Sequence, residues 1–190
     1  MNRRTSVIQT VIWLLVLGAA VAWPYCTHST TIADDLTRFT VRVALGYYAV
    51  AAARMLVGKC DGSTRLLWTF AWASYLVHLA MAFHHYHRWS HADAIAHTEE
   101  VSGFGPGIYF SHLFSLLWTI DVVYWWWQPA RYERRARWMN WSLHGYMAFI
   151  IFNATVIYET GLIRWVGLGM FAVLTAVYLG ARTAKRVTSP

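Results

Sequence analysis

Residues 66–87 read LLWTFAWASYLVHLAMAFHHYH, an apolar stretch without aspartate, glutamate, lysine or arginine. A helix needs roughly 20 mainly apolar residues to span the hydrocarbon core of a bilayer. This stretch has that length, and it ends in a run of histidines. It therefore predicts a transmembrane helix whose last turn carries imidazole side chains to a membrane surface.

Further stretches of similar length and composition flank it on both sides. The whole chain is 57% hydrophobic and 13% charged, whereas soluble domains carry about 25% charged residues. Little sequence is left for a soluble domain. We therefore predict an all-α, polytopic membrane protein in which residues 1–190 form one bundle of six transmembrane helices. The predicted helices are Thr5–Tyr25, Leu36–Val57, Leu66–His87, Ile108–Gln128, Trp138–Glu159 and Leu162–Arg182.

The formal net charge of +7 is compatible with a nucleic-acid partner, but the distribution of the charges favours another explanation. With six helices, the segments rich in arginine and lysine all fall on one side of the membrane, and cytoplasmic loops are enriched in these residues. The opposite loops are acidic. We therefore predict an integral inner-membrane protein with cytoplasmic termini, which contacts the lipid bilayer and no nucleic acid. The basic residues of these segments are Arg3, Arg4, Arg54, Lys59, Arg65, Arg131, Arg134, Arg135, Arg137, Arg182, Lys185 and Arg186, and the acidic residues of the opposite loops are Asp34, Asp35, Asp93, Glu99 and Glu100.

The first predicted helix has a second interpretation. Its basic start at Asn2–Arg4 and the small residues Ala20–Ala22 are also typical of a cleaved signal peptide. We expect the helix to be retained, with cleavage as the alternative.

A cluster of histidines follows the apolar stretch. If the third helix continues past the membrane edge, His84, His87 and His91 share one face, because they lie at positions i, i+3 and i+7. The next helix brings His112 back to a similar depth. Imidazole suits zinc, copper and iron, so we predict a transition-metal site at a histidine-rich extracytoplasmic loop, residues 84–107. The second-choice ligands are His97 and Glu159.

The alternative for these histidines is an interfacial belt, in which amphipathic imidazole rings lie among the lipid headgroups without a metal. Within the same loop, Ser90–Glu100 contains good helix formers. We expect this segment to form a short helix.

His78 lies deeper in the third helix, near mid-bilayer. Ionisable groups inside a membrane are costly and are functional candidates. His78 is therefore a candidate ligand for a single b-type haem, with Arg42 near a propionate. A two-haem arrangement is not expected, because neither His112 nor His144 has a second histidine thirteen or fourteen residues away on its own helix.

Asp121 and His144 belong to neighbouring predicted helices, in the cytoplasmic half of the membrane at comparable depth. Such a pair can relay protons, or it can clamp two helices together through a hydrogen bond. The sequence does not separate these two roles.

These patterns predict a small integral membrane metalloprotein with a redox or hydrolytic role, for which no catalytic residue can be assigned. Two alternatives stay open. One is a metal or proton-coupled transport component, and the other is a scaffold or assembly subunit of a larger membrane complex. Membrane-protein partners or a homo-oligomer are compatible with each of them.

Overall fold

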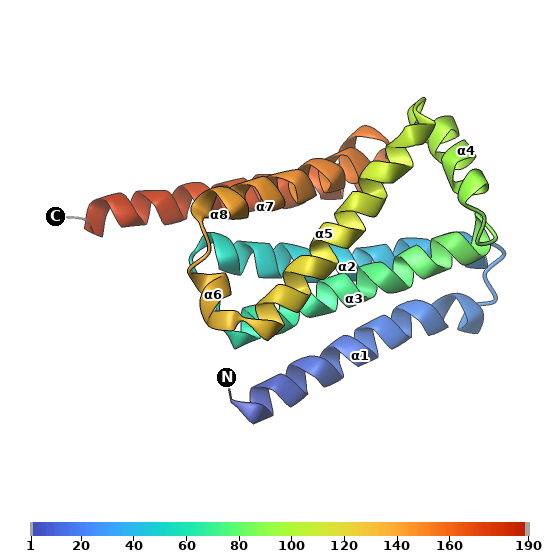
Figure 1. Ribbon diagram of the computed structural model, residues 1–190. Helices are drawn as coiled ribbons and strands as arrows, with labels where there is room; N and C mark the ends of the chain where they lie inside the picture. Colours follow the sequence, from blue (N-terminus) through green and yellow to red (C-terminus); the bar gives the residue numbers. More distant parts are fainter. Residues whose placement is uncertain (1, 189–190) are drawn as a thin grey trace. The chain divides into compact units, whose positions relative to one another are not determined.

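The computed structural model describes residues 2–188, so Met1 and residues 189–190 of the predicted domain lie outside the described residues. Helices make up almost all of the described chain, which contains no strand, and the all-α prediction is confirmed. The helices (Figure 1) are α1 (Arg3–Cys26), α2 (Ile32–Leu56), α3 (Gly62–His85), α4 (His91–Ser102), η1 (Gly105–Gly107), α5 (Ile108–Trp127), α6 (Pro129–Glu133), α7 (Arg137–Phe152), η2 (Asn153–Ile157) and α8 (Gly161–Thr188).

The chain packs as two compact units. The first unit contains the residues up to Ala52 together with Cys60–Ala94, and the second contains Ala53–Lys59 and the residues from Ile95 onward. The first unit is therefore built from α1, most of α2, and α3. The second is built from α5 to α8 and the end of α4, a helix that confirms the prediction for Ser90–Glu100.

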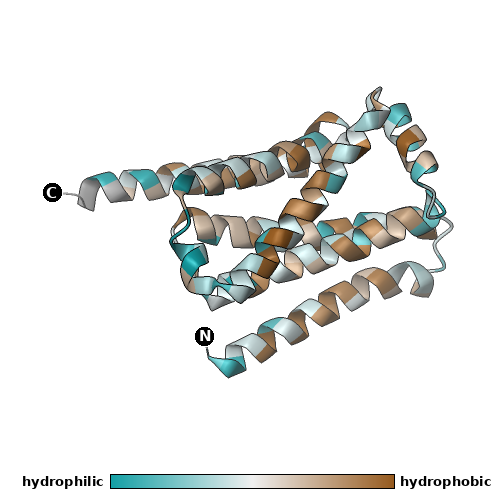
Figure 2. Cartoon of the chain, viewed as in Figure 1, coloured by the Kyte–Doolittle hydropathy of each residue, from teal (hydrophilic) through white to brown (hydrophobic). Residues whose placement is uncertain are grey.

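Within residues 2–188, three helices are long and apolar enough to cross a membrane: α1, α3 and the first 24 residues of α8. The middle of α1 is a largely brown, hydrophobic stretch in Figure 2. Only 6% of the apolar window of α1 and of α8 is buried inside the protein. Large exposed apolar surfaces mark contact with a partner or a membrane, so a membrane location is supported.

The other predicted segments are helical as well, but each differs from a simple apolar span. α7 is a regular α-helix for only 16 residues before the π-helical turn η2 follows it. α5 is 20 residues long and rich in aromatic residues. α2 contains several charged residues, which include Asp34, Asp35, Arg38, Arg42 and Arg54. The predicted count of six membrane crossings therefore stays a prediction.

In the first unit, α2 and α3 run antiparallel, and ring contacts and hydrogen bonds fix their register. Near one end, the rings of Tyr48 and Trp68 lie with centroids 5.6 Å apart. Nearer the other end, Nδ1 of His78 lies 2.9 Å from the carbonyl oxygen of Thr37. From Thr37 onward, the buried positions of α2 recur every three or four residues, as expected of one helix face. They are Leu36, Thr37, Thr40, Ala44, Tyr48 and Ala51.

α1 lies beside α3 in the same direction (Figure 1), and polar side chains join the two helices. The Gln9 amide donates to the Ser63 hydroxyl at 2.6 Å, and the Trp13 indole N–H donates to the Ser74 hydroxyl at 2.9 Å. Trp13 also stacks on Phe70, with centroids 4.8 Å apart. Such contacts matter in a membrane, because apolar side chains gain little by leaving lipid for another helix.

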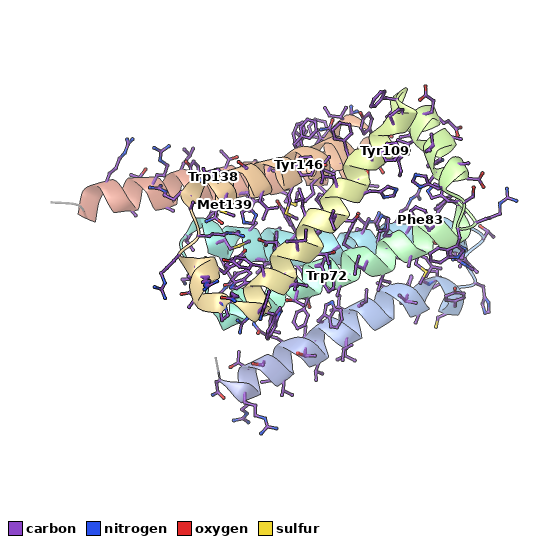
Figure 3. The ribbon with its side chains drawn as sticks, in the orientation of Figure 1. Trp72, Phe83, Tyr109, Trp138, Met139 and Tyr146 are labelled. Carbon is purple, nitrogen blue, oxygen red and sulfur yellow. The ribbon has the colours of Figure 1, made fainter. Side chains whose placement is uncertain are left out.

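In the second unit, α7 and α8 run antiparallel. The rings of Trp141 and Tyr178 meet edge to face at 5.6 Å, and those of Phe152 and Phe171 do so at 5.3 Å. α5 joins α7 through the hydroxyl of Tyr146, labelled in Figure 3, which donates to the carbonyl of Phe110 at 2.7 Å.

The tightest helix contact in this unit is between η2 and Gly167 of α8. A Cβ atom added at Gly167 would lie 2.8 Å from Oγ1 and 3.0 Å from Cβ of Thr155. Thr155 has little freedom to move away, because it is buried and its hydroxyl donates to the Ile151 carbonyl at 2.7 Å. Glycine is therefore required at position 167 for steric reasons.

We predict that Gly167→Ala destabilises the protein, since overpacking costs about 1–3 kcal/mol. Gly169 provides the matched control, because a Cβ there meets nothing within 4 Å. Gly169→Ala should stabilise by up to about 1 kcal/mol through helix propensity. Thermal unfolding of the full-length protein in detergent measures both changes, and equal shifts for the two variants would contradict the close contact.

Candidate functional site

The third helix ends earlier than the predicted metal site requires. α3 ends at His85, and Tyr86 follows as its C-cap. Arg88 and Trp89 then take positive φ values of 47° and 62°, a left-handed conformation that is uncommon for residues other than glycine. His91 begins the separate helix α4. The prediction that His84, His87 and His91 share one continuous helix face is therefore wrong.

Imidazole rings nevertheless lie close together at the end of α3. The rings of His84 and His85 have centroids 4.8 Å apart and meet edge to face. His84 is exposed and His85 is half-buried. His87 is buried and packs edge-on against Phe83, which Figure 3 labels near the end of this helix. The structure therefore brings two imidazoles, those of His84 and His85, into contact in the last turn of α3.

A carboxylate that the sequence analysis did not assign to this site lies at the same end of the first unit. The Tyr86 hydroxyl donates to the carboxylate of Asp34, at the start of α2. Partial burial and then this hydrogen bond raise the pKa of the Tyr86 hydroxyl, so it stays protonated as the donor. An antiparallel α2–α3 pair necessarily places the beginning of one helix beside the end of the other. This arrangement is the signal from which sequence analysis could have found Asp34.

The other predicted ligands are found in the second unit. His97 is exposed on α4, His112 is half-buried beside Tyr109 with ring centroids 6.4 Å apart, and Glu159 is half-buried after η2. Over residues 2–188, the structure does not arrange three or more histidine, cysteine, aspartate or glutamate side chains to hold a metal ion. A metal centre built from the whole predicted set stays a prediction.

The two residues predicted for haem binding, His78 of α3 and Arg42 of α2, have different surroundings, and haem binding by them stays a prediction. Nδ1 of His78 faces the carbonyl of Thr37 at 2.9 Å, and a histidine with one nitrogen bonded in this way has its ring orientation fixed. Arg42 lies off the buried face of α2. It is exposed, and its guanidinium carbon is 5.4 Å from the centre of the Phe39 ring.

The second unit contains a buried ionic cluster where α5, α6 and α7 meet. Arg135 forms an ion pair with Asp121, and the two side chains are only 6% and 2% exposed. The same guanidinium donates to the Tyr132 hydroxyl at 3.0 Å and to the Asn140 side-chain oxygen. Its Nη2 atom also lies 3.4 Å from Nε2 of His144.

Aromatic rings form one wall of this cluster. The guanidinium carbon of Arg135 lies 3.9 Å from the centre of the Tyr132 ring, and Tyr132 stacks on Trp125 with centroids 4.2 Å apart. Tyr132 also donates its hydroxyl to Asp121 at 3.0 Å. Guanidinium groups are planar and stack well on aromatic faces. Packing and hydrogen bonds therefore fix the orientation of Arg135 together.

Arg135 stands between Asp121 and His144, the two residues predicted to form a relay or a clamp. A guanidinium donates hydrogen bonds and does not lose its proton in proteins. His144 therefore accepts through Nε2 and carries its proton on Nδ1. This geometry favours a clamp over a proton path through Arg135. Sequence analysis missed Arg135 and Tyr132 because Arg135 was interpreted only as one of the basic loop residues.

No family model, curated protein or solved structure matches the chain.

We predict that Asp121→Asn destabilises the protein by about 3–5 kcal/mol, because it leaves the buried charge of Arg135 without its partner. Combining it with Arg135→Gln should recover part of the loss, since no unpaired charge then remains buried. Glu133→Gln, an exposed carboxylate change on the neighbouring α6, should stay within about 0.5 kcal/mol of the wild type. Chemical denaturation in detergent measures this cycle, and strictly additive single-variant losses would contradict the clamp.

Proposed function

We propose that this protein is a six-helix integral membrane protein with cytoplasmic termini that binds a transition metal ion at the extracytoplasmic end of α3. The observation that carries the proposal is the contact between the His84 and His85 rings, whose centroids lie 4.8 Å apart. Imidazole is a suitable ligand for zinc, copper and iron. The ion would be held by these two rings, with water or the molecule that delivers the metal in the other positions.

The number of ligands indicates what kind of metal chemistry suits this end of the protein. Structural zinc sites are closed by four protein ligands, so two imidazoles favour transient binding over a permanently held ion. Asp34 adds negative charge nearby through its contact with Tyr86, and acidic groups raise the local concentration of cations. We therefore propose metal capture and transfer, as in a transport component, in place of a fixed redox or hydrolytic centre.

The metal site is tested by titrating the purified, tag-free protein with zinc or copper(II) in isothermal calorimetry. We expect the wild type to bind, and His84→Ala/His85→Ala to bind at least roughly tenfold more weakly, since even changes beyond the ligands themselves cost that much. His28→Asn is the control, because His28 is exposed and has a φ of 49° that asparagine tolerates. Unchanged affinity in the double variant refutes the proposed site.

The proposed topology is tested separately with the two native cysteines. Cys26 ends α1 and is exposed, whereas Cys60 lies between α2 and α3; neither forms a disulfide. With cytoplasmic termini they lie on opposite sides, so a membrane-impermeant maleimide added to intact cells should label Cys26 only. Cys26→Ser should abolish the label and Cys60→Ser should preserve it. Labelling of Cys60 in intact cells is incompatible with this topology.

A further inference from the structure

We propose that the C-terminal end of α8 binds the headgroup phosphate of an anionic phospholipid. A hollow of about 120 Å³ there is lined by Leu179, Arg182, Thr183 and Arg186. Their spacing along the helix places these residues on one face. The site thus combines two guanidinium groups and an apolar wall over two turns of one helix.

Contacts with α7 help to position one of the two arginines. Arg182 donates through Nη1 to the Tyr178 hydroxyl at 3.3 Å, and its guanidinium carbon lies 5.6 Å from the centre of that ring. Tyr178 in turn meets Trp141 of α7 edge to face at 5.6 Å. Arg182 is therefore oriented before a ligand arrives, which lowers the entropic cost of binding.

The charge of the hollow selects an anion. Within residues 2–188, neither Arg182 nor Arg186 has a carboxylate partner. Arginine binds phosphate oxygens through paired, charge-assisted hydrogen bonds. The Thr183 hydroxyl already donates to the Leu179 carbonyl at 3.1 Å. The two arginines therefore supply the binding.

The position of the hollow favours a lipid over a free phosphate ion. The apolar part of α8 extends from Gly161 to Ala184, so Arg182 and Arg186 flank its end, at the depth where headgroups lie. Leu179, which lines the hollow, is 55% exposed and offers an apolar surface for the start of an acyl chain. Basic residues at the ends of membrane helices attract anionic lipids.

The test is native mass spectrometry of the full-length protein in detergent, titrated with phosphatidylglycerol or with zwitterionic phosphatidylcholine. Each arginine near an anionic surface should contribute roughly fivefold, so the wild type should prefer phosphatidylglycerol by roughly 30-fold. Arg182→Gln/Arg186→Gln should lose this preference, and Arg182→Lys/Arg186→Lys, which preserves the charge, should keep most of it.

The control is Arg3→Gln/Arg4→Gln, which removes the same charge from the exposed start of α1 and should leave the preference intact. Retention of the preference in the α8 glutamine variant overturns the proposal, as does an equal loss in the α1 control. Displacement of phosphatidylglycerol by millimolar inorganic phosphate would identify a free-anion site and also overturn it. Circular dichroism melts verify that each variant is folded.

Discussion

Hydrocarbon offers no hydrogen-bond partners, and the hydrogen bonds within the described helices meet this constraint. Backbone polar groups in a membrane must be satisfied within the protein, which helices achieve along their own length. Hydroxyl groups follow the same rule. Thr40 donates to the Leu36 carbonyl at 2.6 Å, and Ser115 donates to the Ser111 carbonyl at 2.9 Å. An apolar sequence can therefore carry many hydroxyl groups along its helices.

The same constraint explains how the second unit accommodates a charged pair. Arg135 and Asp121 are both almost completely buried, and burying charges is tolerated only when they are paired and hydrogen-bonded. Tyr132, Asn140 and His144 complete the bonding of the guanidinium. The short helix α6 carries Tyr132, so this turn is part of the packed structure and more than a connection between two long helices.

Apolar composition and segment length predicted every long helix, because a helix satisfies its own backbone hydrogen bonds in an apolar environment. The turn after His85 was not predictable, since Arg88 and Trp89 adopt left-handed conformations that their residue types do not favour. Pro129 follows the end of α5 and begins α6, a short helix that the sequence analysis did not predict. The role of Arg135 was missed because an arginine in a loop normally indicates topology, and only the fold brings it back to α5.

We expect lipid to cover the helices that the protein itself leaves exposed. α1 is the sharpest case, because only 6% of its apolar window is buried inside the protein. Hydrogen–deuterium exchange of the full-length protein in lipid nanodiscs tests this claim directly. If lipid covers α1, amides in the middle of α1 exchange as slowly as those in the middle of α3. Rapid exchange throughout α1, with protection confined to α3, would contradict it.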